Sequence, residues 1–204
     1  EEGLLEAVFM GLAISPDNKK VYVAGGQQNR IYIFDLASSK KLGDITCSTS
    51  FDGTDYSDAY IGDLVLTKDG NRLYAVDQIG FRMLVVDTKS RKVIHNVKTG
   101  RYPFGIALSP DERTVYVANV GMFEYSYIKS LDKRRIRETA QRFPTSAYGS
   151  KEMREGVKND TIEFEGLGDP NAPESFSVWG IDVSKSTPGV VSKVKRGVLV
   201  GEGV

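Results

Sequence analysis

Three aspartates recur at one place in three related stretches, and they are the first residues that could do chemistry. Asp17 lies in GLAISPDNKKVYVAGG, Asp69 in GDLVLTKDGNRLYAVDQ and Asp111 in GIALSPDERTVYVANV. Converging carboxylates can hold a metal ion or act as general acid and base. Here each carboxylate instead follows a Ser-Pro or Thr-Lys pair between two apolar runs, a composition typical of tight turns. We therefore predict that all three cap backbone N–H groups and play a structural role.

A second group of carboxylates lies in the segment STSFDGTDYSDAY, residues 48–60, where Asp52, Asp55 and Asp58 recur every third residue. Oxygen-rich loops with a glycine can bind calcium, but an EF-hand loop places its ligands at alternate residues and ends in a bidentate Glu. We expect a solvated loop and predict neither a metal nor a cofactor.

The chain has one histidine, His95, and one cysteine, Cys47. A Ser-His-Asp triad or a multi-histidine metal site cannot be assembled around a single histidine in an apolar run. We expect His95 to be an exposed residue of an outer strand. A lone cysteine excludes an intrachain disulfide, so Cys47 is expected to be a small, half-buried apolar residue. His95 and Cys47 therefore give no indication of a catalytic site.

Each of the three related stretches has the pattern of a strand, a tight turn and a second strand. Asp35 and Asp87 follow Asp17 and Asp69 by 18 residues and end a third strand, and a fourth begins near Lys40 and Lys92. Four antiparallel strands in a unit of about 40–45 residues match one blade of a β-propeller. We therefore predict an all-β propeller with about three blades: residues 9–46, 61–98, and 103–120 continued by 177–200.

The third unit is interrupted, because Asp111 finds its counterpart only at Asp182, 71 residues later. The inserted residues 121–176 open with the aromatic GMFEYSY. Apolar residues over 130–143 then fall on one helical stripe, which predicts a short amphipathic helix. The basic run KRRIR, residues 133–137, is more typical of a solvated helix face than of a phosphate site.

VYVAGG, LYAVDQ and VYVANV, each after SPD or TKD and before a strand ending in Asp, resemble the YVTN family of β-propeller repeats. The stretch VKTGRYPFGIALSPD also resembles the link between two repeats of that family. TKDG and LYAVDQ make the second unit the most divergent. The resemblance implies a piece of a seven-bladed propeller whose remaining blades lie elsewhere.

The borders of the insertion, ANVGMFEYSY and GLGDPNAPESFSVWGIDV, further resemble bacterial proteins in which a propeller precedes an alkaline-phosphatase-like phosphoesterase domain. That similarity implies a periplasmic or extracellular location. It leaves two function classes open. The propeller is either a non-catalytic scaffold or recognition module, or, as in the seven-bladed lactonases, itself a hydrolase.

The overall charge of the chain limits the kinds of partner that it could bind. The 27 acidic and 27 basic residues balance, which argues against binding nucleic acid. No run of 18 apolar residues that would span a membrane is present. The start, with Glu1 and Glu2, does not resemble a signal peptide. We expect the partner to be another protein or domain, or a small polar ligand.

Strand directions place the long segments 48–60 and 121–176 at one end of the blades, which we call the loop face, and the short SPD-type turns at the other, the turn face. Because long loops on a rigid scaffold usually carry function, we predict that the loop face binds and that the insertion lies across it. The candidate binding residues are Gln28, Arg30, Asp77, Gln78, Arg82, Arg101, Phe123, Tyr125, Tyr127, Arg134 and Arg135.

Apolar residues in the alternating runs are predicted to lie within and between blades. They are Ile14, Val21, Val23, Ile31, Ile33, Leu66, Val86, Ile106, Val115, Val117, Val178 and Ile181. Trp179 is expected to pack between blades rather than to serve as a stacking platform.

Overall fold

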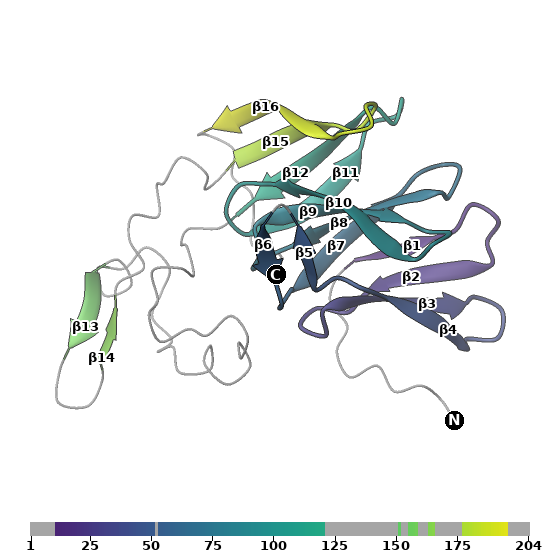
Figure 1. Cartoon of the computed structure of the whole chain (residues 1–204), viewed down its shortest axis with the longest axis horizontal. Coiled ribbons are helices and arrows are strands. Elements are labelled where there is room, and N and C mark those ends of the chain that lie inside the picture. The colour runs from purple at the N-terminus through teal and green to yellow at the C-terminus, as the bar shows by residue number, and fades with distance from the viewer. Residues whose placement is uncertain are drawn as a thin grey trace.

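Three four-stranded antiparallel sheets form most of the chain that the computed structural model describes, which comprises residues 11–51, 53–120, 151, 155–158, 163–165 and 177–195. The sheets stack side by side in chain order as three blades (Figure 1). The prediction of an all-β propeller with three four-stranded blades is confirmed. The helix predicted over 130–143 lies outside the described residues.

The strands follow the repeat. Blade one consists of β1 (Leu12–Ile14), β2 (Lys20–Ala24), β3 (Arg30–Asp35) and β4 (Lys41–Thr46). Blade two consists of β7 (Ile61–Leu66), β8 (Arg72–Asp77), β9 (Arg82–Asp87) and β10 (Lys92–Lys98). Blade three consists of β11 (Pro103–Leu108), β12 (Thr114–Asn119), β15 (Ser177–Asp182) and β16 (Gly189–Lys195). In each blade every strand pairs with the next one in the sheet, so the order is that of a simple meander.

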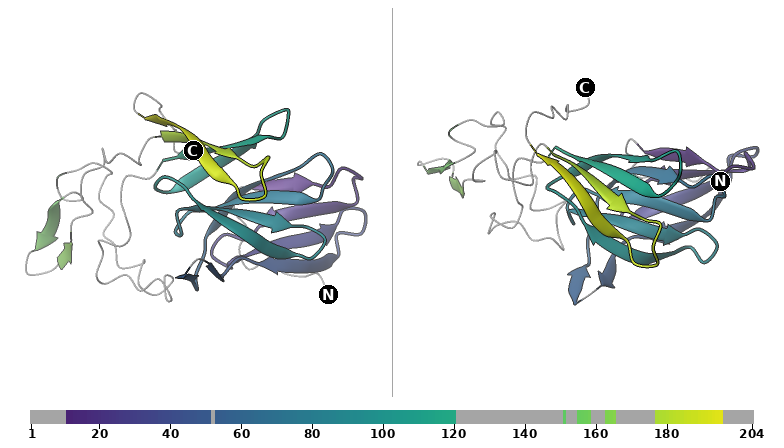
Figure 2. Two further views of the ribbon diagram at one scale, coloured as in Figure 1. Left: turned by 45° about the horizontal axis from the view of Figure 1, so that its top comes forward. Right: turned by 90° about the horizontal axis from the view of Figure 1, so that it is seen from above.

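Two apolar cores hold the blades together, one on each side of blade two. Figure 2 shows the sheet of blade two between those of blades one and three. We call the side of a blade that meets the preceding blade its leading face, and the side that meets the following blade its trailing face. Tyr22 and Ile31 on the trailing face of blade one pack in the same core as Leu73 and Leu84 on the leading face of blade two. The second core joins the trailing face of blade two to the leading face of blade three.

The twelve residues predicted to lie in interfaces divide into three groups. Ile31, Ile33, Val86, Val115, Val117 and Ile181 are buried, and Val21, Val23, Leu66, Ile106 and Val178 are partly buried. The prediction is wrong for Ile14, which is 48% exposed. Its strand, β1, presents Ile14 on the leading face of blade one, where no described blade packs.

The segment 48–60, expected as a solvated loop, contains a hairpin of β5 (Thr49–Phe51) and β6 (Thr54–Tyr56). Gly53 turns this hairpin with a φ of 76°, a conformation that L-residues other than glycine rarely adopt. Inside the insertion, β13 (Gly156–Lys158) pairs with β14 (Glu163–Glu165), a hairpin that was not predicted. The insertion begins and ends at neighbouring strands, since Asn119 pairs with Ser177.

The first strands of the blades, β1, β7 and β11, form the inner edges of the three sheets, and polar contacts also join the blades there. The second repeat is one residue longer than the others, and the register shift between Ile61 and Leu64 absorbs that residue. At this bulge the backbone N–H of Gly11 donates to the Gly62 carbonyl across 3.0 Å, which links blade one to blade two. Asp63 Oδ2 accepts the N–H of Ile106 at 3.1 Å, which links blade two to blade three.

Candidate functional site

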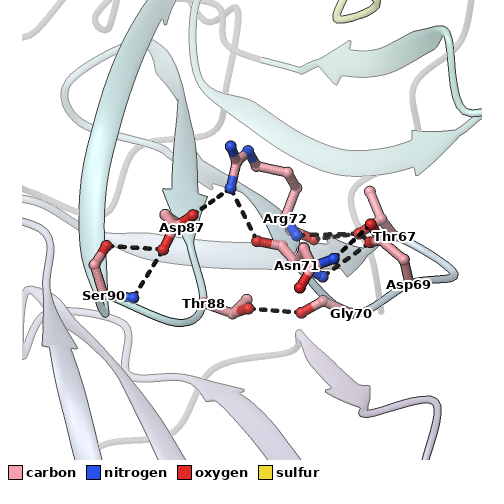
Figure 3. Close-up of polar contacts among 8 residues, drawn as sticks. All are labelled: Thr67, Asp69, Gly70, Asn71, Arg72, Asp87, Thr88 and Ser90. Carbon is pink, nitrogen blue, oxygen red and sulfur yellow. Dashed lines mark hydrogen bonds and ion pairs between the residues drawn. The ribbon is translucent and has the colours of Figure 1, made fainter.

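The three recurrent aspartates lie in the turns between the first and second strands, as predicted. In blade two, Asp69 Oδ1 accepts the Thr67 hydroxyl at 2.6 Å and the Asn71 N–H at 2.9 Å (Figure 3). These hydrogen bonds, led by that from Thr67, lower the pKa of Asp69 to about 2. The structural role predicted for Asp69 is therefore confirmed.

The other two turns repeat this arrangement. Asp17 accepts the Ser15 hydroxyl at 2.6 Å and the Lys19 N–H at 3.1 Å, and Asp111 accepts the Ser109 hydroxyl and the Arg113 N–H at the same two distances. The pKa of Asp17 and that of Asp111 are likewise lowered, mainly by these serine hydroxyls. All three carboxylates of the repeat are thus engaged in shaping the turn face.

A second set of aspartates shapes the turns between the third and fourth strands. Asp35, Asp87 and Asp182 each accept both the N–H and the hydroxyl of a serine, Ser38, Ser90 and Ser184 respectively. Asp87 also pairs with Arg72, which joins the two turns of blade two (Figure 3). Polar side chains on this face therefore hold its short turns in place.

On the loop face, Asp77 and Arg82 form a fully buried ion pair. They lie opposite each other on β8 and β9, with 2.7 Å between Arg82 Nε and Asp77 Oδ2, and both side chains have 0% exposure. The other carboxylate oxygen, Oδ1, accepts the N–H groups of Tyr60 at 2.9 Å and Gly80 at 3.1 Å. A buried charge is tolerated when its hydrogen bonds are satisfied in this way.

The remaining donors of Arg82 anchor the β5–β6 hairpin. Nη2 donates to the Cys47 carbonyl at 2.8 Å, and Nη1 donates to Thr49 Oγ1 at 3.1 Å and Asn96 Oδ1 at 2.8 Å. The guanidinium also lies 3.8 Å from the centre of the Tyr56 ring, a cation–π distance. One side chain thus fixes the chain leaving blade one, both strands of the hairpin and the outer strand of blade two.

Gln78, the residue after Asp77, is also completely buried. Neither atom of its side-chain amide has a hydrogen-bond partner among the described residues. It fits closely under the bulge of β7, because a Cβ on Gly62 would lie 2.5 Å from Gln78 Nε2. Asp77 and Arg82 are therefore brought together, whereas Gln78 packs against Gly62. All three lie inside the blade rather than on its surface, where we expected them.

The other predicted binding residues are spread out. Gln28, Arg30 and Arg101 are partly exposed. Arg30 occupies in blade one the position of Arg82 in blade two, but it pairs with its own outer strand through Asp44, at 3.3 Å between Nη1 and Oδ2. Five predicted residues, Phe123, Tyr125, Tyr127, Arg134 and Arg135, lie outside the described residues, as does any contact of that part of the insertion with the loop face.

His95 and Cys47 differ from expectation in their burial. His95 is partly buried rather than exposed, because its ring meets the Phe51 ring edge-on at 6.1 Å. Cys47 is completely buried, not half-buried, and burial raises the pKa of its thiol. The hairpin thus covers His95, whereas Cys47 is buried in the core between blades one and two.

Trp179 is 4% exposed on β15, as expected for a packed residue, and the Lys193 ammonium lies 3.7 Å from the centre of its ring. No group of three His, Cys, Asp or Glu side chains in the described part of the chain could hold a metal ion. Within that part, no helix combines the length and apolar character needed to cross a membrane.

Four residues of the site were not singled out from the sequence: Thr49, Tyr56 and Asn96, which bind Arg82, and the inter-blade residue Asp63. Asp-Gly between alternating residues in TSFDGTDY was a signal for the hairpin that carries the first two. The extra residue of the second repeat marked the bulge at Asp63. No local sequence pattern marks Asn96 as a residue of this site.

Comparison with solved structures shows which fold this chain shares. Hydrazine synthase from Kuenenia stuttgartiensis is similar over 95% of this chain, with a TM-score of 0.51 and 20% identity. U3-55K and the WD40 repeats of RRP9 are each similar over 93% of it, with TM-scores of 0.55 and 0.56 and 12% identity. This chain covers 50%, 40% and 39% of those three chains, respectively. It thus spans at most half the length of these structures.

No protein-family model and no curated protein matches the sequence. Membership of the YVTN family therefore stays a prediction. Since WD40 repeats form propeller blades, the likeness to the RRP9 repeats and the three stacked sheets agree: the described chain is three blades of a β-propeller.

Proposed function

We propose that this chain is a non-catalytic β-propeller module that binds a protein or an attached domain through its loop face. The observation that carries the proposal is the anchoring of the β5–β6 hairpin by Arg82. The anchoring side chain is inaccessible, whereas Ser50, Thr54 and Asp55 of the hairpin are exposed. The hairpin projects from the stacked sheets (Figure 2). A polar loop held rigidly on a scaffold is suited to recognition, because little conformational freedom is lost on binding.

Other features support recognition rather than chemistry. The recurrent aspartates are committed to turns, and Asp77 is committed to Arg82. His95, whose imidazole is the side chain best suited to proton transfer near neutral pH, lies on an outer strand against Phe51. The alternative, a hydrolase of the lactonase type, needs a polar site in the central channel. Turnover of a lactone by the purified chain would favour that alternative.

Three further statements belong to the same proposal and rest on sequence resemblance. The blades are of the YVTN type, the propeller belongs to a polypeptide with a phosphoesterase domain, and that polypeptide works in the bacterial periplasm or outside the cell. The hairpin and the residues 121–176 then supply the contact surface for the attached domain.

A photo-crosslinking experiment tests the proposal. A photoreactive amino acid replaces Thr54 on the hairpin or, as a matched control, Lys89 on the turn face, which is also exposed. Irradiation in extract of the source cells should give a crosslinked product from position 54 that excess unlabelled chain suppresses, and none from position 89. The same products from both positions, or none from position 54, would contradict the proposal.

A further inference from the structure

The three turns between the first and second strands of the blades share one backbone conformation. The fourth residue of each turn donates its N–H to the carbonyl three residues earlier, at 2.8 or 2.9 Å. It also has a positive φ, which is 55° at Asn18, 70° at Gly70 and 58° at Glu112. Glycine and asparagine adopt this conformation readily, but glutamate does so at a cost. The turn itself therefore gives no reason for Glu112.

Lys68 is a second departure from the repeat. Blades one and three have proline at the second position of this turn, Pro16 and Pro110, whereas blade two has Lys68. Proline has no backbone N–H. The N–H of Lys68 donates to Glu112 Oε1 across 2.6 Å, and the Lys68 ammonium donates to the carbonyl of Pro110. The two unusual residues thus meet across the boundary between blades two and three.

The boundary between blades one and two is built from a different pair. There Pro16 lies against Gly70, since a Cβ at position 70 would be 3.0 Å from Pro16 Cδ and 3.4 Å from Pro16 Cγ. Gly70→Glu would crowd this proline, and Lys68→Pro would leave Glu112 without its donor. Each boundary therefore accepts its own pair and disfavours the pair of the other boundary.

We propose that the pairs Pro16–Gly70 and Lys68–Glu112 determine which blade packs after which. Blades of similar sequence can associate out of order, within one chain or between chains, and such misassembly is a characteristic failure of repeat proteins. Specific pairing requires contacts that penalise the wrong partner as well as contacts that favour the right one. If blade three followed blade one directly, Pro16 would face Glu112 and provide no donor. All four residues lie on the turn face between described blades, so this assignment is independent of the proposed function of the loop face.

A double-mutant cycle measures the Lys68–Glu112 pair. Lys68→Pro should fold, because the same turn in blades one and three contains proline. It removes the donor, however, and should raise the equilibrium constant for unfolding about five- to tenfold in urea titrations. In a chain that also carries Glu112→Gly, Lys68→Pro should change this constant by less than about twofold, because the proline–glycine pair of the first boundary is then repeated. The same cost of Lys68→Pro in both backgrounds would overturn the proposal.

Refolding tests the order of the blades directly. With Lys68→Pro and Glu112→Gly together, both boundaries carry the same kind of pair. This double variant should be about as stable as the wild type. After dilution from urea at high protein concentration, it should nevertheless give a fraction of misassembled oligomer about twofold larger or more. Size-exclusion chromatography with light scattering measures that fraction.

The matched control adds Pro16→Lys and Gly70→Glu to the double variant, which exchanges the two pairs between the boundaries and keeps them distinct. It should refold as cleanly as the wild type. A control that fails to fold, or that misassembles like the double variant, would overturn the proposal. Equal fractions of oligomer for the double variant and the wild type would also overturn it, because the pairs would then stabilise the blades without ordering them.

Discussion

Asp63 of blade two accepts a hydrogen bond from the backbone N–H of Ile106 in blade three, with 3.1 Å between Oδ2 and the nitrogen. Asp63→Ala leaves this partly buried N–H without its partner, which costs about 1–3 kcal/mol. We expect the urea midpoint of unfolding to fall accordingly. Asp55→Ala, which removes an exposed carboxylate from the hairpin, should change stability by less than about 0.5 kcal/mol. Equal effects of the two substitutions would show that Asp63 does not link the blades.

Arg82 and Arg30 occupy equivalent positions in different surroundings, which makes them a matched pair. Arg82→Met leaves the carboxylate of Asp77 buried and uncompensated, a change that typically costs about 3–5 kcal/mol. Arg30→Met breaks a partly exposed pair with Asp44 and should cost about 1 kcal/mol or less. Chemical denaturation of both variants measures the difference. If Arg30→Met costs as much as Arg82→Met, the buried ion pair is not what fixes the hairpin.

The low pKa of Asp69 predicts a dependence of stability on pH. Because folding lowers this pKa from 3.8 to about 2, ionised Asp69 contributes its full stabilisation above about pH 4 and loses it as the pH falls towards 2. Asp69→Asn removes the charge while keeping an acceptor oxygen. The variant should be less stable than the wild type at pH 6, and the two should converge near pH 2. A constant gap between their unfolding midpoints over this range would refute the assignment.

Gly11 lies where a side chain cannot fit. A Cβ at this position would be 2.5 Å from Asp63 Cα and 2.8 Å from the Leu64 nitrogen, both backbone atoms. Gly11→Ala should therefore force the inner strands of blades one and two apart, at a cost of about 1–3 kcal/mol. Gly189→Ala is the control, since a Cβ there meets nothing within 4 Å. Thermal unfolding compares the two variants, and a tolerated alanine at position 11 would contradict the close approach.

The parts of the structure that depend on near neighbours in sequence could be predicted. Asp17, Asp69 and Asp111 accept hydrogen bonds from residues two positions away, so the turn pattern contains all the information needed. The blades could be predicted for the same reason, because each strand pairs mainly with the next strand along the chain.

Burial could not be predicted as well, because it depends on the neighbouring blade. Tyr22 and Val21 are both apolar and adjacent on β2, and only the position of blade two makes Tyr22 the buried residue. The burial of Arg82 could not be predicted for a similar reason. Arg82 binds Cys47, 35 residues earlier in the chain, and no local pattern announces that contact. A charged residue was therefore assigned to the surface when it lies inside.

The position of blade two between the two cores has a consequence for how the chain opens. The strands β8 and β9 are covered on both faces, whereas β1 and β16 lie at the ends of the stack. Amide protons of β8 and β9 should exchange with solvent only when the whole molecule unfolds, and those of β1 and β16 should exchange through smaller openings. The middle blade is then the last cooperative unit to open. The hairpin clamped to it by Arg82 should be protected with it, although it lies on the surface.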